Sequence, residues 1–174
     1  MSVPLLFKVM IFGEPEALKQ ELAKKYMTGS FIENTKMTTG FDFNIKVLII
    51  NQQKVTLQIW DFGGQEHFAS ILPMYVRGTK GALLIYDVAN KSTLNKIDDW
   101  LETIRSNVER DIPIILVGFA PRQAEYREVS LEEGMNMAKS KGITVFIECN
   151  VRTGENVEEI FVMLTKLILK KFKH

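Results

Sequence analysis

Hydrophobic and polar residues follow two periodic patterns along this chain, and together they predict alternating strands and helices. Continuous apolar runs, typical of strands buried on both faces of a parallel sheet, occupy residues 6–12, 81–88, 112–117 and 143–147. Apolar residues at helical spacing occupy residues 16–26, 90–108 and 156–173. Ser130 and Glu133 form a capping box that opens one further helix, which ends near Lys141.

Strict alternation distinguishes two further segments. Between residues 41 and 49 the apolar positions are Phe41, Phe43, Ile45, Val47 and Ile49. This pattern predicts a strand with these five side chains on one face, and we expect that face to be buried in the core. Val55, Leu57 and Ile59 alternate in the same way after a short turn at residues 51–53, so the two segments predict an antiparallel hairpin.

The order of these elements predicts an α/β fold in a single domain, residues 1–174. The parallel strands require crossover helices that cover both faces of the sheet. Ligands of such sheets bind beyond the carboxyl ends of the strands. The residues at those ends are Gly13, Asp61, Asp87, Gly118 and Cys149.

Composition excludes several classes of function. The 174 residues are 46% hydrophobic and carry a net charge of +1, which gives no reason to expect a nucleic-acid partner. The single Cys149 excludes an internal disulfide and suits a reducing compartment, so we expect a cytoplasmic protein. No apolar run is long enough to span a membrane. The final residues, LKKFKH, contain no Cys, so no prenylation motif is visible.

The first strand leads into a candidate phosphate-binding loop. A strand, a Gly, a short loop and a Lys at the start of a helix are the parts of the G-x-x-x-x-G-K-[ST] motif. Here the motif reads G-E-P-E-A-L-K-Q, with Gly13 and Lys19 in place. Leu18 stands where the second Gly permits close approach of the backbone, and Gln20 stands where a hydroxyl binds magnesium.

Three longer stretches resemble one protein family. Residues 60–66 read WDFGGQE, which resembles W-D-x-x-G-Q-E; residues 75–88 read YVRGTKGALLIYDV; and residues 153–161 read TGENVEEIF. Over nearly its whole length the chain resembles the Ras-superfamily small GTPases, and within them the Rab branch. The resemblance implies a P-loop NTPase-like fold: a six-stranded, mostly parallel sheet with one antiparallel strand pair and helices on both faces. It also implies GTP or GDP with Mg²⁺ as ligands.

The resemblance assigns roles to individual residues. The implied nucleotide contacts are Gly13, Lys19, Gln20, Phe31, Thr38 and Gly64. The implied magnesium contacts are Gln20, Thr38 and Asp61, where the Gln20 amide oxygen would replace the hydroxyl. Gln65 matches the residue that positions the attacking water, so it is the candidate catalytic residue.

The same comparison shows where the chain departs from the family pattern. The family reads guanine with N-K-x-D after the fifth strand, and this chain has Phe119-Ala120-Pro121-Arg122 there. Losing a hydrogen bond to the charged Asp costs about 10- to 100-fold in affinity. Phe119 could instead stack on a base of any kind.

The phosphate loop has changed as well. Pro15 has no N–H to offer a phosphate oxygen, and Glu14 and Glu16 bring negative charge towards a negative ligand.

These features leave three hypotheses. The first is a GTPase-fold protein that binds nucleotide weakly or without base selectivity and acts as an interaction module. The alternative is a functional switch that binds and hydrolyses GTP in signalling or membrane traffic. The third is another phosphorylated ligand in the same crevice. In the first two, protein partners bind the switch-like loops and the 41–60 hairpin, where Trp60 and the apolar residues of 41–49 could serve as anchors unless they face the core.

Overall fold

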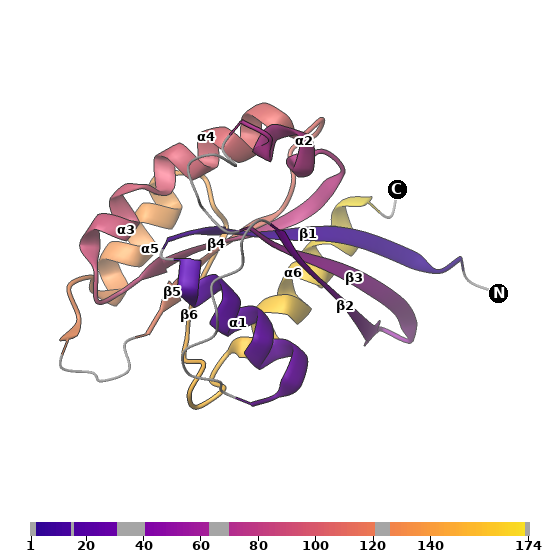
Figure 1. The fold of residues 1–174 in the computed structure, drawn as a ribbon, viewed down its shortest axis with the longest axis horizontal. Helices are drawn as coiled ribbons and strands as arrows, with labels where there is room; N and C mark the ends of the chain where they lie inside the picture. Colours follow the sequence, from indigo (N-terminus) through magenta and orange to yellow (C-terminus); the bar gives the residue numbers. More distant parts are fainter. Residues whose placement is uncertain (1–2, 15, 31–40, 63–69, 121–125, 173–174) are drawn as a thin grey trace.

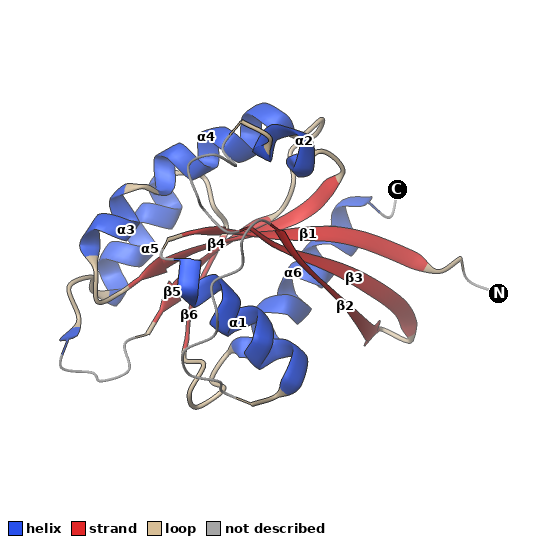
Figure 2. Ribbon diagram, in the orientation of Figure 1, coloured by secondary structure: helices blue, strands red, loops and turns tan. Residues whose placement is uncertain are grey.

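A six-stranded sheet forms the centre of the computed structural model, which describes residues 3–14, 16–30, 41–62, 70–120 and 126–172. In chain order the strands are β1 (Leu5–Gly13), β2 (Phe41–Ile50), β3 (Gln53–Phe62), β4 (Thr79–Asp87), β5 (Ile114–Phe119) and β6 (Val145–Cys149). Their order across the sheet is β2-β3-β1-β4-β5-β6, and only β2 and β3 pair antiparallel (Figures 1 and 2). The fold class predicted from the sequence is confirmed.

Helices cover both faces of this sheet. They are α1 (Glu16–Thr28), α2 (Leu72–Val76), α3 (Lys91–Asn95), α4 (Ile97–Asn107), α5 (Leu131–Ser140) and α6 (Val157–Phe172). The first and last pack on one face, and the four others contribute to the apolar cluster on the opposite face. The predicted capping box of Ser130 and Glu133 is confirmed. The single helix predicted over 90–108 is wrong in one respect, because it is interrupted at Lys96 and becomes α3 and α4.

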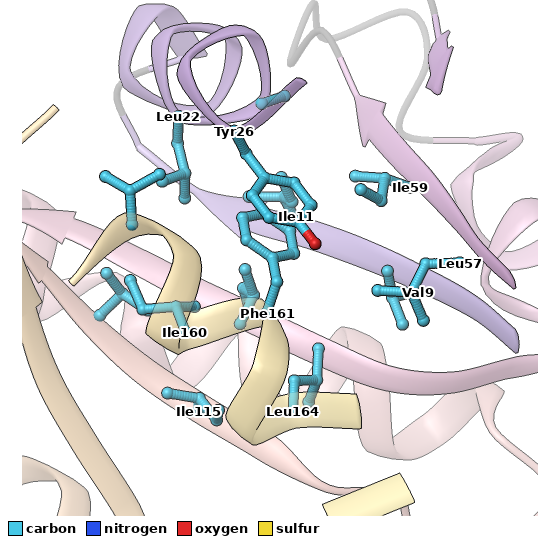
Figure 3. Close-up of a cluster of buried hydrophobic side chains, with 14 of the residues drawn as sticks. Val9, Ile11, Leu22, Tyr26, Leu57, Ile59, Ile115, Ile160, Phe161 and Leu164 are labelled. Carbon is cyan, nitrogen blue, oxygen red and sulfur yellow. The ribbon is translucent and has the colours of Figure 1, made fainter. Parts of the chain in front are cut away.

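The two clusters explain the continuous apolar run of β1. Val9 and Ile11 face α1 and α6, whereas Met10 and Phe12 belong to the cluster on the other face. At the centre of the first cluster, the rings of Tyr26 on α1 and Phe161 on α6 stack with centroids 3.9 Å apart (Figure 3). Both faces of the central strands are therefore buried, as the sequence pattern predicted.

The prediction for β2 is wrong about which face is buried. Phe43, Ile45, Val47 and Ile49 are 43–67% exposed, whereas Leu48 and Ile50 on the opposite face are buried. The alternation correctly places the odd-numbered residues on one face. That face, however, is the one turned away from α1 and α6, and no described helix covers it at β2.

The hairpin turn explains how β2 and β3 pair in perfect register. Ile50 pairs with Gln53, so the loop consists of Asn51 and Gln52 alone. Both have positive φ, 49° and 64°, as in a type I′ turn. The twist of this turn matches that of the strands, and the ladder runs without a bulge from there to Phe41 and Phe62.

The stacked pair between α1 and α6 gives a first test. We expect Phe161→Ala to lower the free energy of unfolding by about 3–5 kcal/mol, because it removes a fully buried ring and leaves a cavity. Met163→Ala, on the solvent side of the same helix, should change it by less than about 1 kcal/mol. Urea unfolding monitored by circular dichroism measures both, and equal losses would contradict this account of the core.

Candidate functional site

The candidate site lies at the carboxyl ends of neighbouring strands. In β1 and β3, Ile11 pairs with Asp61; in β1 and β4, Gly13 pairs with Ile85. Asp87 at the end of β4 pairs with Phe119 at the end of β5. The sheet therefore brings the ends of four strands to one edge, as expected for an α/β ligand site.

Gly13 is required at this edge by the packing of the backbone. Its φ is +121°, and a Cβ at this position would lie 2.0 Å from the carbonyl oxygen of Ile85 on β4. No side chain fits there. The first Gly of the motif is thus needed for the contact between β1 and β4, whatever the loop binds.

Lys19 is the residue whose position matters most for phosphate binding. It lies on α1, one turn from the N-terminus, and its side chain is completely buried. Its Nζ donates a hydrogen bond to the carbonyl oxygen of Phe62 at 2.6 Å. The ammonium group is therefore tied to the end of β3, within the described part of the protein.

Two aromatic rings lie close to this ammonium group. Nζ of Lys19 lies 5.4 Å from the ring centroid of Phe62 and 5.6 Å from that of Trp100 on α4. Trp100 also contacts the ring of Phe12, at 6.0 Å between centroids. A desolvated ammonium over such faces gains about 2 kcal/mol. We call Phe62 and Trp100 the aromatic cage.

The sequence does not predict this cage. Trp100 is one of the apolar residues at helical spacing in 90–108, and Phe62 is an unspecified position of W-D-x-x-G-Q-E. One signal was present: a large aromatic residue stands directly after the aspartate of a predicted phosphate site. Only the fold shows that β3 and α4 bring these rings to Lys19.

The implied magnesium contacts are only partly described. Gln20 on α1 and Asp61 at the end of β3 are both buried at this edge, consistent with a polar interior there. Within the described residues, no group of three or more His, Cys, Asp or Glu could hold a metal ion. Phe31, Thr38, Gly64 and Gln65 lie outside the residues that the structure describes, so their roles stay predictions.

Phe119 occupies the position of the guanine-reading Asn, and it is a core residue. Its side chain is 4% exposed and belongs to the same apolar cluster as Cys149 and Val151, with the half-buried Leu18 packed against that cluster. This placement does not favour stacking of the Phe119 ring on a base.

The adjacent loop after β6 is closed on itself. Oδ1 of Asn150 accepts hydrogen bonds from the N–H groups of Arg152 and Thr153, at 3.0 and 3.2 Å. The Asn150 N–H in turn donates to the carbonyl of Glu155 at 3.0 Å.

Burial raises the pKa of Cys149 to about 12, so its sulfur stays a thiol at neutral pH.

Carboxylates that could replace the missing guanine contact are engaged in local structure. Asp87 Oδ1 accepts from the N–H of Ala89 at 2.9 Å, and Glu128 Oε2 accepts from the N–H of Lys91 at 2.8 Å. Glu14, in the phosphate loop, forms a salt bridge with Lys96 at 3.0 Å. Arg122 and Glu125 lie outside the described residues.

The hairpin surface carries a second group of aromatic rings. The Trp60 ring contacts those of Phe43, at 5.0 Å between centroids, and Tyr75, at 6.0 Å. Lys8 Nζ lies 4.9 Å from the Trp60 ring and donates hydrogen bonds to the carbonyls of Tyr75 and Arg77. Burial lowers the pKa of Lys8 from its ordinary value. Lys8 thereby fixes the segment after α2 against β1.

No helix within the described residues is long and apolar enough to cross a membrane.

Comparison with known proteins agrees with the fold. A sequence model of the Ras family matches residues 8–170. The chain is 38% identical to the Ras-related protein Rab-4 of Dictyostelium discoideum over 172 residues, which cover 98% of this chain and 83% of that protein. Fold, sheet order and sequence similarity together establish that the chain belongs to the Ras family and has a Rab-like small GTPase fold.

Proposed function

We propose that this protein uses the small GTPase fold as an interaction module in the cytoplasm, and that it binds nucleotide weakly and without selectivity for guanine. Protein partners would bind the hairpin of β2 and β3 and the loops beside it. The observation that carries this proposal is the position of Lys19, whose ammonium group is buried and donates a hydrogen bond to the carbonyl oxygen of Phe62.

A phosphate would compete with the present partners of the Lys19 ammonium group. A phosphate-binding lysine contributes when its ammonium group is free to contact the outer phosphates. Here a nucleotide would have to withdraw Nζ from the Phe62 carbonyl and from the cage, and both interactions strengthen as water is excluded. The interactions lost on binding would offset those gained, which lowers the affinity for any triphosphate.

Phe119 stands where selectivity for guanine would be determined. Guanine recognition requires polar groups that face the base, and a side chain packed among Cys149 and Val151 presents none. Where the family has the Asp of N-K-x-D, this chain has Arg122, whose charge is opposite to that of a carboxylate. Any nucleotide that enters would thus be held by its phosphates, and GTP and ATP would bind alike.

A working GTP switch is the second candidate. Two observations favour it: Asp61 is buried at the end of β3, where the family binds magnesium, and the chain is similar to a Rab protein over nearly its whole length. In this reading Gln65 would position the water for hydrolysis, and Gln20 and Thr38 would complete the magnesium site. Nucleotide binding separates the two candidates.

The first measurement is thermal unfolding of the purified protein with added nucleotide. A ligand at a concentration equal to its Kd stabilises by about 0.4 kcal/mol, which for a chain of this size raises Tm by about 1–2 °C. We expect about 1 mM GTP with Mg²⁺ to raise Tm by no more than this. ATP should give the same result as GTP, because both would be held by their phosphates alone.

Nucleotide released from the denatured protein provides the matching control. We expect less than stoichiometric guanine nucleotide after purification. One equivalent of bound GDP or GTP, or a rise in Tm of several degrees with GTP but not ATP, would contradict the proposal and establish the switch.

The second measurement concerns Lys19 itself. In nucleotide-free buffer, Lys19→Ala should lower the free energy of unfolding by about 2–4 kcal/mol, because it removes a buried hydrogen bond and the contacts with two rings. Lys24→Ala, on the same helix and partly exposed, should change it by less than about 0.5 kcal/mol. If Lys19 served nucleotide binding alone, both variants would be equally stable without nucleotide.

A further inference from the structure

The outer edge of β2 is the largest unexplained feature of this surface. Strand β2 is the first of the six in the sheet, and β3 is the one described strand that pairs with it. Phe43, Ile45, Val47 and Ile49 form an exposed apolar row along it. We call this row the β2 stripe. It extends well beyond the ring group of Phe43, Trp60 and Tyr75.

Soluble proteins usually protect such an edge against pairing with other chains. Prolines, bulges, short length and several inward-pointing charges are the common devices. The segment from Phe41 to Ile50 has ten residues, no Pro and a continuous register with β3. Lys46 is its one basic residue. By these criteria the edge is open to a further strand.

The backbone hydrogen bonds show which groups face outwards. The N–H of Phe43 donates to Oδ1 of Asp42 at 2.9 Å, so it is not used by β3. Backbone groups alternate between the two sides of a strand, so those of Ile45, Val47 and Ile49 point to the same outer edge. The residues of the β2 stripe thus carry both the apolar side chains and the outward backbone groups, of which the Phe43 N–H is already bonded to the Asp42 carboxylate.

We propose that β2 pairs antiparallel with β2 of a second copy of this chain, so that one continuous sheet runs through a twofold symmetric dimer. A strand is self-complementary only if the residues that meet across the axis suit one another. With Asn44 opposite Asn44 of the second copy, Asp42 lies opposite Lys46 of the second copy, and Phe43 lies opposite Ile45. This register brings Phe43 and Ile45 of the two β2 stripes together and forms two ion pairs.

The charges distinguish this register from its neighbours. With Ile45 at the axis, Asp42 would lie opposite Leu48 and Lys46 opposite Asn44, so neither ion pair forms. With Lys46 at the axis, two lysines would stand directly opposite each other, which destabilises a strand pair. Asp42 and Lys46 lie on the same face of β2, beside α1, where Lys46 Nζ sits 5.0 Å from the Tyr26 ring. Opposed residues of neighbouring strands have Cα atoms about 4.5–5.5 Å apart, which is close enough for an ion pair.

The dimer is independent of nucleotide. None of the residues in the pairing belongs to the phosphate loop or to the segment of Phe119. The test of the dimer therefore does not depend on the outcome of the nucleotide measurements. The second copy also explains why the stripe continues from Phe43 to Ile45, because these two residues face each other across the axis.

Sedimentation velocity of the full chain over a concentration series tests the proposal. We expect the wild type to dimerise reversibly. Asp42→Lys and Lys46→Asp should each weaken the dimer at least about tenfold, because each places two pairs of like charges across the axis. Glu132→Lys on α5, far from β2 along the sheet, serves as a matched charge change and should leave the dimer intact.

Mixing the two single variants gives the sharpest result. A chain with Asp42→Lys and a chain with Lys46→Asp carry opposite charges at all four positions, so together they should form a heterodimer while each alone stays monomeric. The double variant with both substitutions should again form a homodimer. Circular dichroism confirms that each variant is folded. The proposal would be overturned if the wild type is monomeric at every concentration. It would also be overturned if the charge substitutions leave the dimer dissociation constant unchanged.

Discussion

A single buried ammonium group connects three parts of the phosphate-binding end of this protein. Lys19 on α1 reaches the carbonyl of Phe62 at the end of β3 and the ring of Trp100 on α4. A buried cation is tolerated only where hydrogen bonds and polarisable groups replace its water. The end of β3 and two helices are therefore held together by the residue that, in the family, serves a ligand. This constraint underlies the proposal that the protein binds nucleotide weakly.

The two faces of the hairpin of β2 and β3 have different neighbours. The inner face of β2 packs on α1 and α6 and belongs to the core. The outer face has no helix over it among the described residues, so the side chains of the β2 stripe remain half exposed. Lys8 and the ring group of Phe43, Trp60 and Tyr75 join this surface to the segment after α2. A partner bound here would contact the sheet and that segment together.

The sequence predicted most of the fold, because apolar periodicity reflects burial directly. The strands of the parallel sheet, the capping box at Ser130 and the hairpin are present, with their ends shifted by a few residues. The error at β2 has a clear cause: alternation shows which residues share a face but not whether a helix covers it. The positions of Gly13 and Lys19 could be predicted from motif spacing. The cage could not, since Phe62 and Trp100 are 38 residues apart in the chain and meet only through tertiary packing.

Phe119 has a consequence for how this sequence can change. Its ring fills space in the apolar cluster beside Cys149 and Val151. An Asn at this position would be smaller and polar, so it would leave a void and an amide that needs new hydrogen bonds. Phe119→Asn would therefore destabilise the core by about 3–5 kcal/mol, as other large aromatic truncations do. The family's Asn could thus be accommodated here only with compensating substitutions in the surrounding cluster.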